Sequence, residues 1–122
     1  MEFKSQRAIY LQIADHLCDQ ILAGRYAEGE KLPSVRELAT EVEVNVNTVA
    51  RSFEWLQLQG VADVRRGMGN YVALGAKAAI EAIRRKEFFA ATLPSLFREM
   101  QTLDITMNEV QDLYNKTLAR HE

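Results

Sequence analysis

Two helical patterns in the first half of this chain lie so close together that the helices must cross sharply. Ser34 and Glu37 have the spacing of a capping box, in which each side chain satisfies a backbone amide of the other, and they predict the start of one helix. Asn45 can cap the next helix by accepting a hydrogen bond from its first turn. Only Glu43 and Val44 remain between the two helices. So short a junction predicts a helix-turn-helix arrangement.

The segments on either side of this pair extend the pattern. Residues 9–22 place apolar side chains at three- and four-residue spacing, which predicts an amphipathic helix ahead of the pair. After Gly60 the period changes to two, so residues 61–64 and 71–72 are expected to be strands. The stretch 65–70 contains two glycines and is predicted to be the turn that joins them. Three helices followed by a β-hairpin form a winged-helix layout.

The remainder of the chain shows no further strand pattern and is expected to be helical. A helix is predicted over residues 76–91, and Pro94 should break or kink it, because proline lacks an amide N–H and disfavours helical geometry in the residue before it. Thr106 and Glu109 have capping-box spacing and predict the start of a last helix. The predicted fold class is mainly α with a small β-hairpin.

The C-terminal tail carries large apolar residues that need a partner, yet it is too short to enclose a core and a ligand pocket of its own. Its helices could fold back onto the N-terminal domain, or they could pair with the same helices of a second chain. Trp55 and Leu58 favour the second alternative, because they lie off the buried stripe of their helix, and symmetric dimers are the commonest oligomers. The residues expected to form the dimer contact are Ile80, Ile83, Phe88, Leu96, Phe97, Met100, Leu103, Val110, Leu113 and Tyr114.

The start of the third helix offers short side chains that avoid its buried stripe. In the major groove of DNA an asparagine can pair with adenine, an arginine with guanine, and a valine or threonine methyl can meet the thymine methyl. Asn47, Arg51 and Val46 have these properties, and Thr48 lies on the first turn. A simpler alternative is that Asn45 and Thr48 serve only as helix caps.

Two further groups of residues could contact a DNA backbone. The start of the second helix faces the backbone in helix-turn-helix geometry, and arginines beside a glycine turn can enter a minor groove or clamp phosphates. A nucleotide-binding glycine loop is the rival interpretation of that turn, but its glycines join two strands and open no helix. The candidates for DNA contact are Ser34, Arg36, Asn45, Val46, Asn47, Thr48, Arg51, Arg65, Arg66, Gly67, Met68 and Gly69.

The charge of the chain argues at first sight against a nucleic-acid binder. Its 122 residues carry 15 Lys and Arg against 17 Asp and Glu, a formal net charge of −2. The first 74 residues hold 8 basic and 10 acidic residues, but the acids lie mainly on the first helix and in loops. Since four arginines gather on the predicted contact face, DNA binding stays possible. We predict weak non-specific affinity and a shallow salt dependence.

Other function classes receive little support from the composition. A single cysteine and two histidines leave few groups for a metal site or a catalytic triad, so no metal, cofactor or enzyme activity is expected. No apolar run reaches the length of a membrane span and no secretory signal is visible, which predicts a cytoplasmic protein. The remaining alternative is a winged helix that serves as a protein-interaction module without DNA.

Several ordered motifs resemble the GntR family of bacterial transcription regulators. They are Ile-Tyr-Leu-Gln-Ile at 9–13, Leu-Pro-Ser-Val-Arg-Glu-Leu-Ala at 32–39, Asn-Val-Asn-Thr-Val at 45–49 and Arg-Gly-Met-Gly-Asn-Tyr-Val at 66–72. The short helical tail resembles the YtrA-like branch. The chain departs from the family pattern at Ala8 and Glu28, where prolines are common, and at Ala50, where some branches carry a DNA-contacting arginine.

The resemblance implies a homodimeric repressor that binds a palindromic operator, often near genes for transporters. Residues 1–74 would then be a winged-helix DNA-binding domain and residues 75–122 a helical dimerisation tail. Ser34 and Arg36 would meet the DNA backbone, Asn45 to Thr48 and Arg51 bases or phosphates, and Arg65 to Gly69 would form the tip of the wing. The residues identify neither the base sequence of the operator nor a small-molecule effector.

Overall fold

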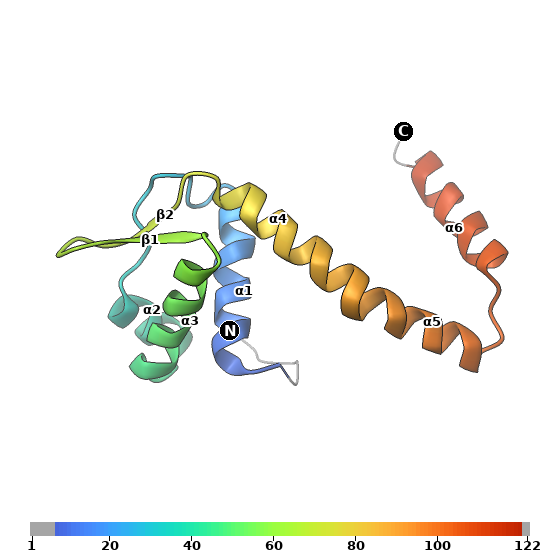
Figure 1. Ribbon diagram of the computed structural model, residues 1–122, viewed down its shortest axis with the longest axis horizontal. Coiled ribbons are helices and arrows are strands. Elements are labelled where there is room, and N and C mark those ends of the chain that lie inside the picture. Colours follow the sequence, from blue (N-terminus) through green and yellow to red (C-terminus); the bar gives the residue numbers. More distant parts are fainter. Residues whose placement is uncertain (1–6, 121–122) are drawn as a thin grey trace. The chain divides into compact units, whose positions relative to one another are not determined.

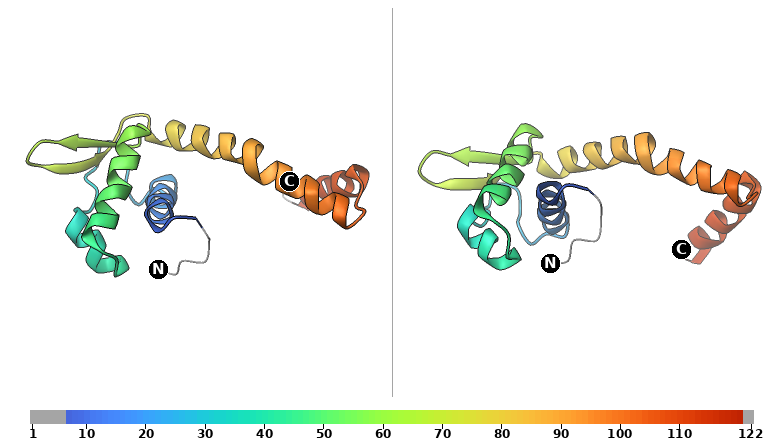
Figure 2. Two further views of the ribbon diagram at one scale, coloured as in Figure 1. Left: turned by 60° about the horizontal axis from the view of Figure 1, so that its bottom comes forward. Right: turned by 90° about the horizontal axis from the view of Figure 1, so that it is seen from below.

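The computed structural model describes residues 7–120 and divides the chain into two compact units between Ile83 and Arg84. In the first unit, α1 (Ile9–Leu22), α2 (Val35–Val42) and α3 (Val46–Leu58) precede an antiparallel hairpin of β1 (Ala62–Arg65) and β2 (Gly69–Val72), shown in Figure 1. α4 (Ala76–Glu87) begins in this unit. Both views of Figure 2 place α3 between α1 and α2 and show the hairpin extending from the helices. The predicted winged-helix fold is confirmed.

Local hydrogen bonds set the starts of α2 and α3 where the sequence predicted them. Ser34 Oγ accepts from the Glu37 amide at 3.0 Å, and Glu37 Oε1 accepts from the Ser34 amide at 3.3 Å. Asn45 Oδ1 accepts from the Asn47 amide at 2.7 Å. Glu43 ends α2 in the left-handed conformation, with φ at 56°, so the chain turns sharply into α3.

The hairpin is longer than the sequence indicated. Its register pairs Ala62 with Val72 and Arg65 with Gly69, so residues expected in the turn belong to the strands. The Met68 amide donates to the Arg65 carbonyl at 2.8 Å and closes a short tip. Gly69 permits this because its φ of 93° is costly for other residues.

The segment just before α2 lies against the second strand of the hairpin. The Gly29 amide donates to the Val72 carbonyl, the Val72 amide donates to the Glu30 carbonyl, and the Leu32 amide donates to the Asn70 carbonyl, at 2.8 to 2.9 Å. β2 is therefore hydrogen-bonded on both edges. We call residues 29–32 the strap, because this segment ties the wing to the start of α2.

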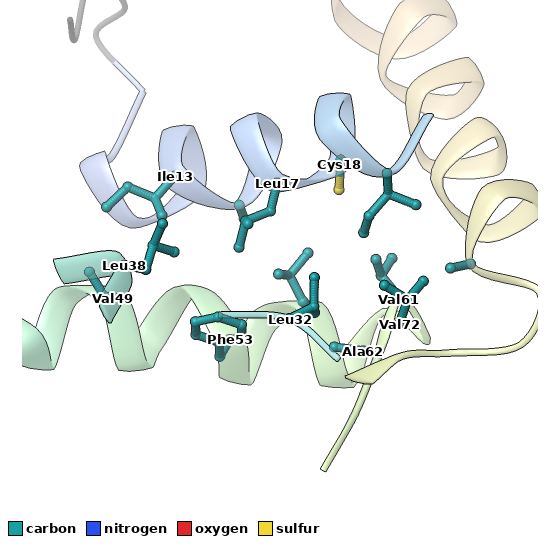
Figure 3. Close-up of a cluster of buried hydrophobic side chains, with 14 of the residues drawn as sticks. Ile13, Leu17, Cys18, Leu32, Leu38, Val49, Phe53, Val61, Ala62 and Val72 are labelled. Carbon is teal, nitrogen blue, oxygen red and sulfur yellow. The ribbon is translucent and has the colours of Figure 1, made fainter. Parts of the chain in front are cut away.

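The core of the first unit lies between α1 and α3 and is closed by the hairpin. Figure 3 shows Ile13 and Leu17 of α1 facing Val49 and Phe53 of α3, with Leu32 of the strap between the helices. Cys18 is buried in the same cluster. These side chains are the apolar stripes that the sequence predicted, and their burial supplies the main driving force for folding.

The start of α4 belongs to this core, so Ile80 has no surface left for the expected dimer contact, whereas the half-buried Ile83 keeps part of its surface exposed. Ile80 is only 1% exposed, and Ile83 packs against the same cluster. The sequence predicts both residues in the dimer contact, because periodicity identifies an apolar face but not the surface that covers it. Trp55 also packs partly against this core, whereas Leu58 is 84% exposed.

The sequence predicts a break or a kink at Pro94, and the helix of the second unit is not broken there but widens just before it. A π-helical turn, Phe88–Thr92, leads into α5 (Leu93–Thr102), and α6 (Met107–Arg120) follows. The Leu93 amide donates to the Phe88 carbonyl, five residues back. This wider turn lets a proline follow at the start of α5 within one continuous run of helix. The capping box of Thr106 and Glu109 is confirmed, at 2.9 and 3.2 Å.

No helix within residues 7–120 is long and apolar enough to cross a membrane.

Candidate nucleic-acid interface

α3 has one buried face and one exposed face at its N-terminal end. Val49 and Phe53 are at most 1% exposed, which fixes the helix on the core. Asn47 and Arg51 are exposed, and Val46 keeps 46% of its surface accessible. The side chains that could contact the edges of bases therefore stand on the solvent side of a rigidly held helix.

The N-terminal half of α3 is anchored to the start of α1. Ser52 is fully buried, and its hydroxyl donates to the Tyr10 carbonyl at 2.6 Å. One residue earlier, the Arg51 guanidinium carbon lies 4.0 Å from the centre of the Tyr10 ring. An open hollow of about 400 Å³ adjoins this pair, and its lining includes Asn47 and Thr48. A cation, two short polar side chains and a hollow thus lie together at the exposed end of α3.

The start of α2 presents a second group of polar side chains. Ser34 is half-buried and Arg36 is exposed. Because the Ser34 oxygen already accepts from Glu37 within the capping box, its hydroxyl proton is the group left to donate outward. The strap ends at Leu32, and only Pro33 separates it from Ser34. The hydrogen bonds of the strap therefore hold the wing near the start of α2.

The tip of the wing carries exposed cations and glycines. Arg65, Arg66 and Met68 are exposed, and the Arg65 guanidinium carbon lies 3.8 Å from the centre of the Tyr71 ring. Gly67 has a φ of 74° and no atom within 4 Å of an added Cβ, so the tip stands clear of the body.

The wing is also tied to α3. Gln57 Nε2 donates to Asn70 Oδ1 at 2.8 Å. This bond joins the C-terminal end of α3 to β2, while the strap joins β2 to the start of α2. All twelve candidates for DNA contact therefore belong to one compact unit with internal cross-links.

Sequence reasoning missed three residues that position these candidates, namely Tyr10, Gln57 and Tyr71. The Tyr71 contact was accessible in principle, because Arg65 and Tyr71 are diagonal neighbours once the hairpin register is known. Tyr10 and Gln57 carried no such signal, since their partners are remote in sequence and only the tertiary packing brings them together.

Comparison with known proteins identifies the family of this unit. The family model for bacterial regulatory proteins of the gntR family matches residues 9–72, which extend from the first residue of α1 to the last residue of β2. The chain belongs to the GntR family. The match ends before α4, so the second unit lies outside it.

Individual GntR relatives match more of the chain. The HTH-type transcriptional regulator YhcF of Bacillus subtilis is 34% identical over 109 residues, which cover 89% of this chain and 88% of YhcF. The HTH-type transcriptional repressor YtrA of the same organism is 39% identical over 77 residues, covering 63% of this chain and 59% of YtrA. Their names describe regulators rather than enzymes.

A solved structure extends the similarity to both units of this GntR chain. A GntR-family regulator from Bacteroides thetaiotaomicron is 45% identical, with a TM-score of 0.80, and covers 94% of this chain and all of that one. Within residues 7–120, no group of three or more His, Cys, Asp or Glu side chains is arranged to hold a metal ion.

Proposed function

We propose that this GntR protein is a homodimeric transcription repressor that binds a two-fold symmetric operator and inserts the N-terminal end of α3 into the major groove. The observation that carries the proposal is the exposure of Asn47, Arg51 and Val46 on a helix whose opposite face is fully buried. Family membership and the regulator names of YhcF and YtrA support the same class of function.

Each part of the candidate interface has a different task in this proposal. Asn47 and Val46 contact base edges and supply sequence specificity. Arg36 and the Ser34 hydroxyl contact phosphates and fix the orientation of the protein on the duplex. Arg65 and the residues up to Gly69 follow the backbone into the neighbouring minor groove.

In this proposal the second unit forms the contact between two copies of the chain. Leu103, Leu113 and Tyr114 are 61% to 67% exposed, and all three lie in one short unit that leaves several large apolar side chains uncovered. A second copy of the chain would cover such a surface in a closed, self-complementary contact. The other expected contacts are Phe88, Leu96 and Phe97, which are exposed, and Val110, which is half-buried. Met100 is buried within the single chain, with only 8% of its surface exposed. The half-sites should lie about 10 bp apart, one turn of the duplex.

Selection from a random pool of duplexes, followed by binding measurements on the enriched sequence, tests DNA reading. Asn47→Ala should relax the preference at one base position of each half-site and weaken binding roughly tenfold per protomer, since a good bidentate contact is worth about 1–3 kcal/mol. Arg36→Ala should weaken binding to all sequences alike. Gln59→Ala, at the exposed far end of α3, is the control and should leave affinity unchanged.

Two outcomes would contradict this reading. If no sequence is enriched, the protein is not a sequence-specific DNA binder, and a protein-interaction module becomes the better account. If a sequence is enriched but Asn47→Ala and Arg36→Ala both bind it as the wild type does, the proposed contact face is wrong.

Sedimentation equilibrium tests the assembly separately. Leu113→Glu should shift the protein towards monomer by at least tenfold in dissociation constant, because a buried unpaired carboxylate is costly. Leu74→Glu introduces the same charge at a site in the first unit that is 83% exposed and should leave the dimer intact. A Leu113→Glu protein that dimerises as tightly as the wild type would remove α6 from the interface.

A further inference from the structure

The contact between Tyr10 and Arg51 has no role in the core of the first unit. Arg51 is exposed, and Tyr10 is half-buried at the second position of α1. Their side chains come from segments 41 residues apart and meet with the guanidinium carbon 4.0 Å from the ring centre, the distance of a stacked cation–π contact. Among residues 7–120, no ion pair involves Arg51. Within that part of the chain, the ring is the group against which this cation lies.

Stacking restrains an arginine without consuming its hydrogen bonds. The five N–H donors of a guanidinium radiate in its plane, and a ring beneath the plane leaves them available. A guanidinium held in this way can donate two parallel hydrogen bonds to a phosphate. It also loses less rotational freedom on binding than a free arginine would, which strengthens the complex.

The backbone beneath the pair is fixed independently of the tyrosine ring. The Ser52 hydroxyl donates to the main-chain carbonyl of Tyr10 at 2.6 Å, and Ser52 is fully buried on the α3 side. The main chain of position 10 is thereby anchored to α3, whatever side chain it carries. The ring and the arginine consequently meet at a set position beside the hollow that Asn47 and Thr48 line.

We propose that Tyr10 is a positioning residue for DNA binding, which holds the Arg51 guanidinium on the flank of α3 where it meets a backbone phosphate. Arg51 lies one helical turn behind Asn47. When the N-terminal end of a helix enters the major groove, the side chains one turn back stand at the edge of the groove, where the phosphates are. The inference rests on the proposed function, because it requires this end of α3 to face DNA.

A double-mutant cycle on the full chain separates positioning from a structural role. The probe is the duplex that the wild-type protein selects from a random pool, and the variants are Tyr10→Leu, Arg51→Ala and the pair. Arg51→Ala should weaken binding about tenfold or more through the lost charged hydrogen bonds. Tyr10→Leu should weaken it about two- to fivefold per protomer, the worth of an exposed cation–π contact. In the Arg51→Ala background, Tyr10→Leu should have no further effect.

Two controls accompany the cycle. Tyr10→Phe keeps the ring and should restore wild-type affinity. Tyr26→Leu removes another half-buried tyrosine that packs against the core. It should change DNA affinity by the same factor in the wild-type and the Arg51→Ala backgrounds, because Tyr26 does not position Arg51. The slope of log affinity against log salt should fall by about 0.9 per protomer in Arg51→Ala, and by less in Tyr10→Leu, which keeps the cation but no longer holds it in place.

The possible failures are distinguishable. If Tyr10→Leu weakens binding equally in both Arg51 backgrounds, the ring is merely structural and the positioning role is wrong. If Arg51→Ala weakens binding but Tyr10→Leu does not, the arginine contacts DNA without help from the ring. If Arg51→Ala itself has no effect while Asn47→Ala does, the helix reads DNA as proposed and only this inference falls. If neither Arg51→Ala nor Asn47→Ala weakens binding, the N-terminal end of α3 does not face DNA, and the proposed contact face is wrong together with this inference.

Discussion

Replacing Ile80 by alanine should destabilise the winged-helix unit and leave the proposed dimer unchanged. Ile80 is 1% exposed within the core of the first unit. Removing three carbon groups at about 0.8 kcal/mol each costs roughly 2.4 kcal/mol in lost burial. The cavity adds to this, and buried isoleucine-to-alanine changes cost about 2–5 kcal/mol, so we expect about 3 kcal/mol. The midpoint of thermal unfolding should fall by about 12 °C or more, given 4–8 °C per kcal/mol in a domain of this size.

The chain provides its own probe for this measurement. Trp55 is the only tryptophan, and it packs partly against the core of the first unit, so its fluorescence reports the unfolding of that unit. Urea titration at one fixed protein concentration is the assay, because the stability of a dimer depends on concentration. Leu74→Ala is the matched control, since Leu74 is 83% exposed in the same unit and its loss should change stability by no more than about 0.5 kcal/mol.

The opposite result would overturn the assignment of Ile80 to the core. Sedimentation of Ile80→Ala, measured well below its unfolding midpoint, should give the wild-type dissociation constant. A weakened dimer together with an unchanged urea midpoint would mean that Ile80 lies in the contact between two chains, as its helical spacing first indicated.

Two further expectations follow from the backbone and from the charges. Glu43→Gly should raise the free energy of unfolding by about 0.5–1 kcal/mol, because Glu43 has a left-handed φ of 56° that glycine adopts without strain. Urea titration measures this change. A destabilised variant would show that the Glu43 side chain matters more than its backbone. Operator affinity should fall only shallowly with salt, because the first 74 residues hold 8 basic against 10 acidic side chains. Fluorescence anisotropy across a salt series measures the slope, and a slope near −10 would refute the view that few phosphates are contacted.

Local chemistry made much of the fold predictable. The capping residues Ser34, Asn45 and Thr106 start helices where the sequence placed them, because a cap acts within three residues of its own position. The helix Ile9–Leu22 has the predicted bounds for a related reason, since its apolar spacing matches the buried face it presents to α3.

Features that depend on distant partners were not predictable in the same way. Ile80 has the spacing of an apolar helix face, but nothing local distinguishes a core in its own chain from a surface in another. At Pro94 the sequence indicated a break or a kink, and the π-helical turn that accommodates the proline became visible only in the structure. The Tyr10–Arg51 contact joins two segments whose approach depends on the packing of α1 against α3.

The strap restricts where this protein can gain or lose residues in evolution. β2 is bonded to β1 on one edge and to residues 29–32 on the other, so a one-residue insertion in β2 would shift both sets of partners. It would also pull on the start of α2, since Ser34 follows the strap so closely. The tip around Gly67 is bonded within the hairpin, from the Met68 amide to the Arg65 carbonyl, and a Cβ added at Gly67 would have no atom within 4 Å. Lineages that alter the reach of the wing should therefore differ in length at residues 66–68 and keep the length of β2 constant.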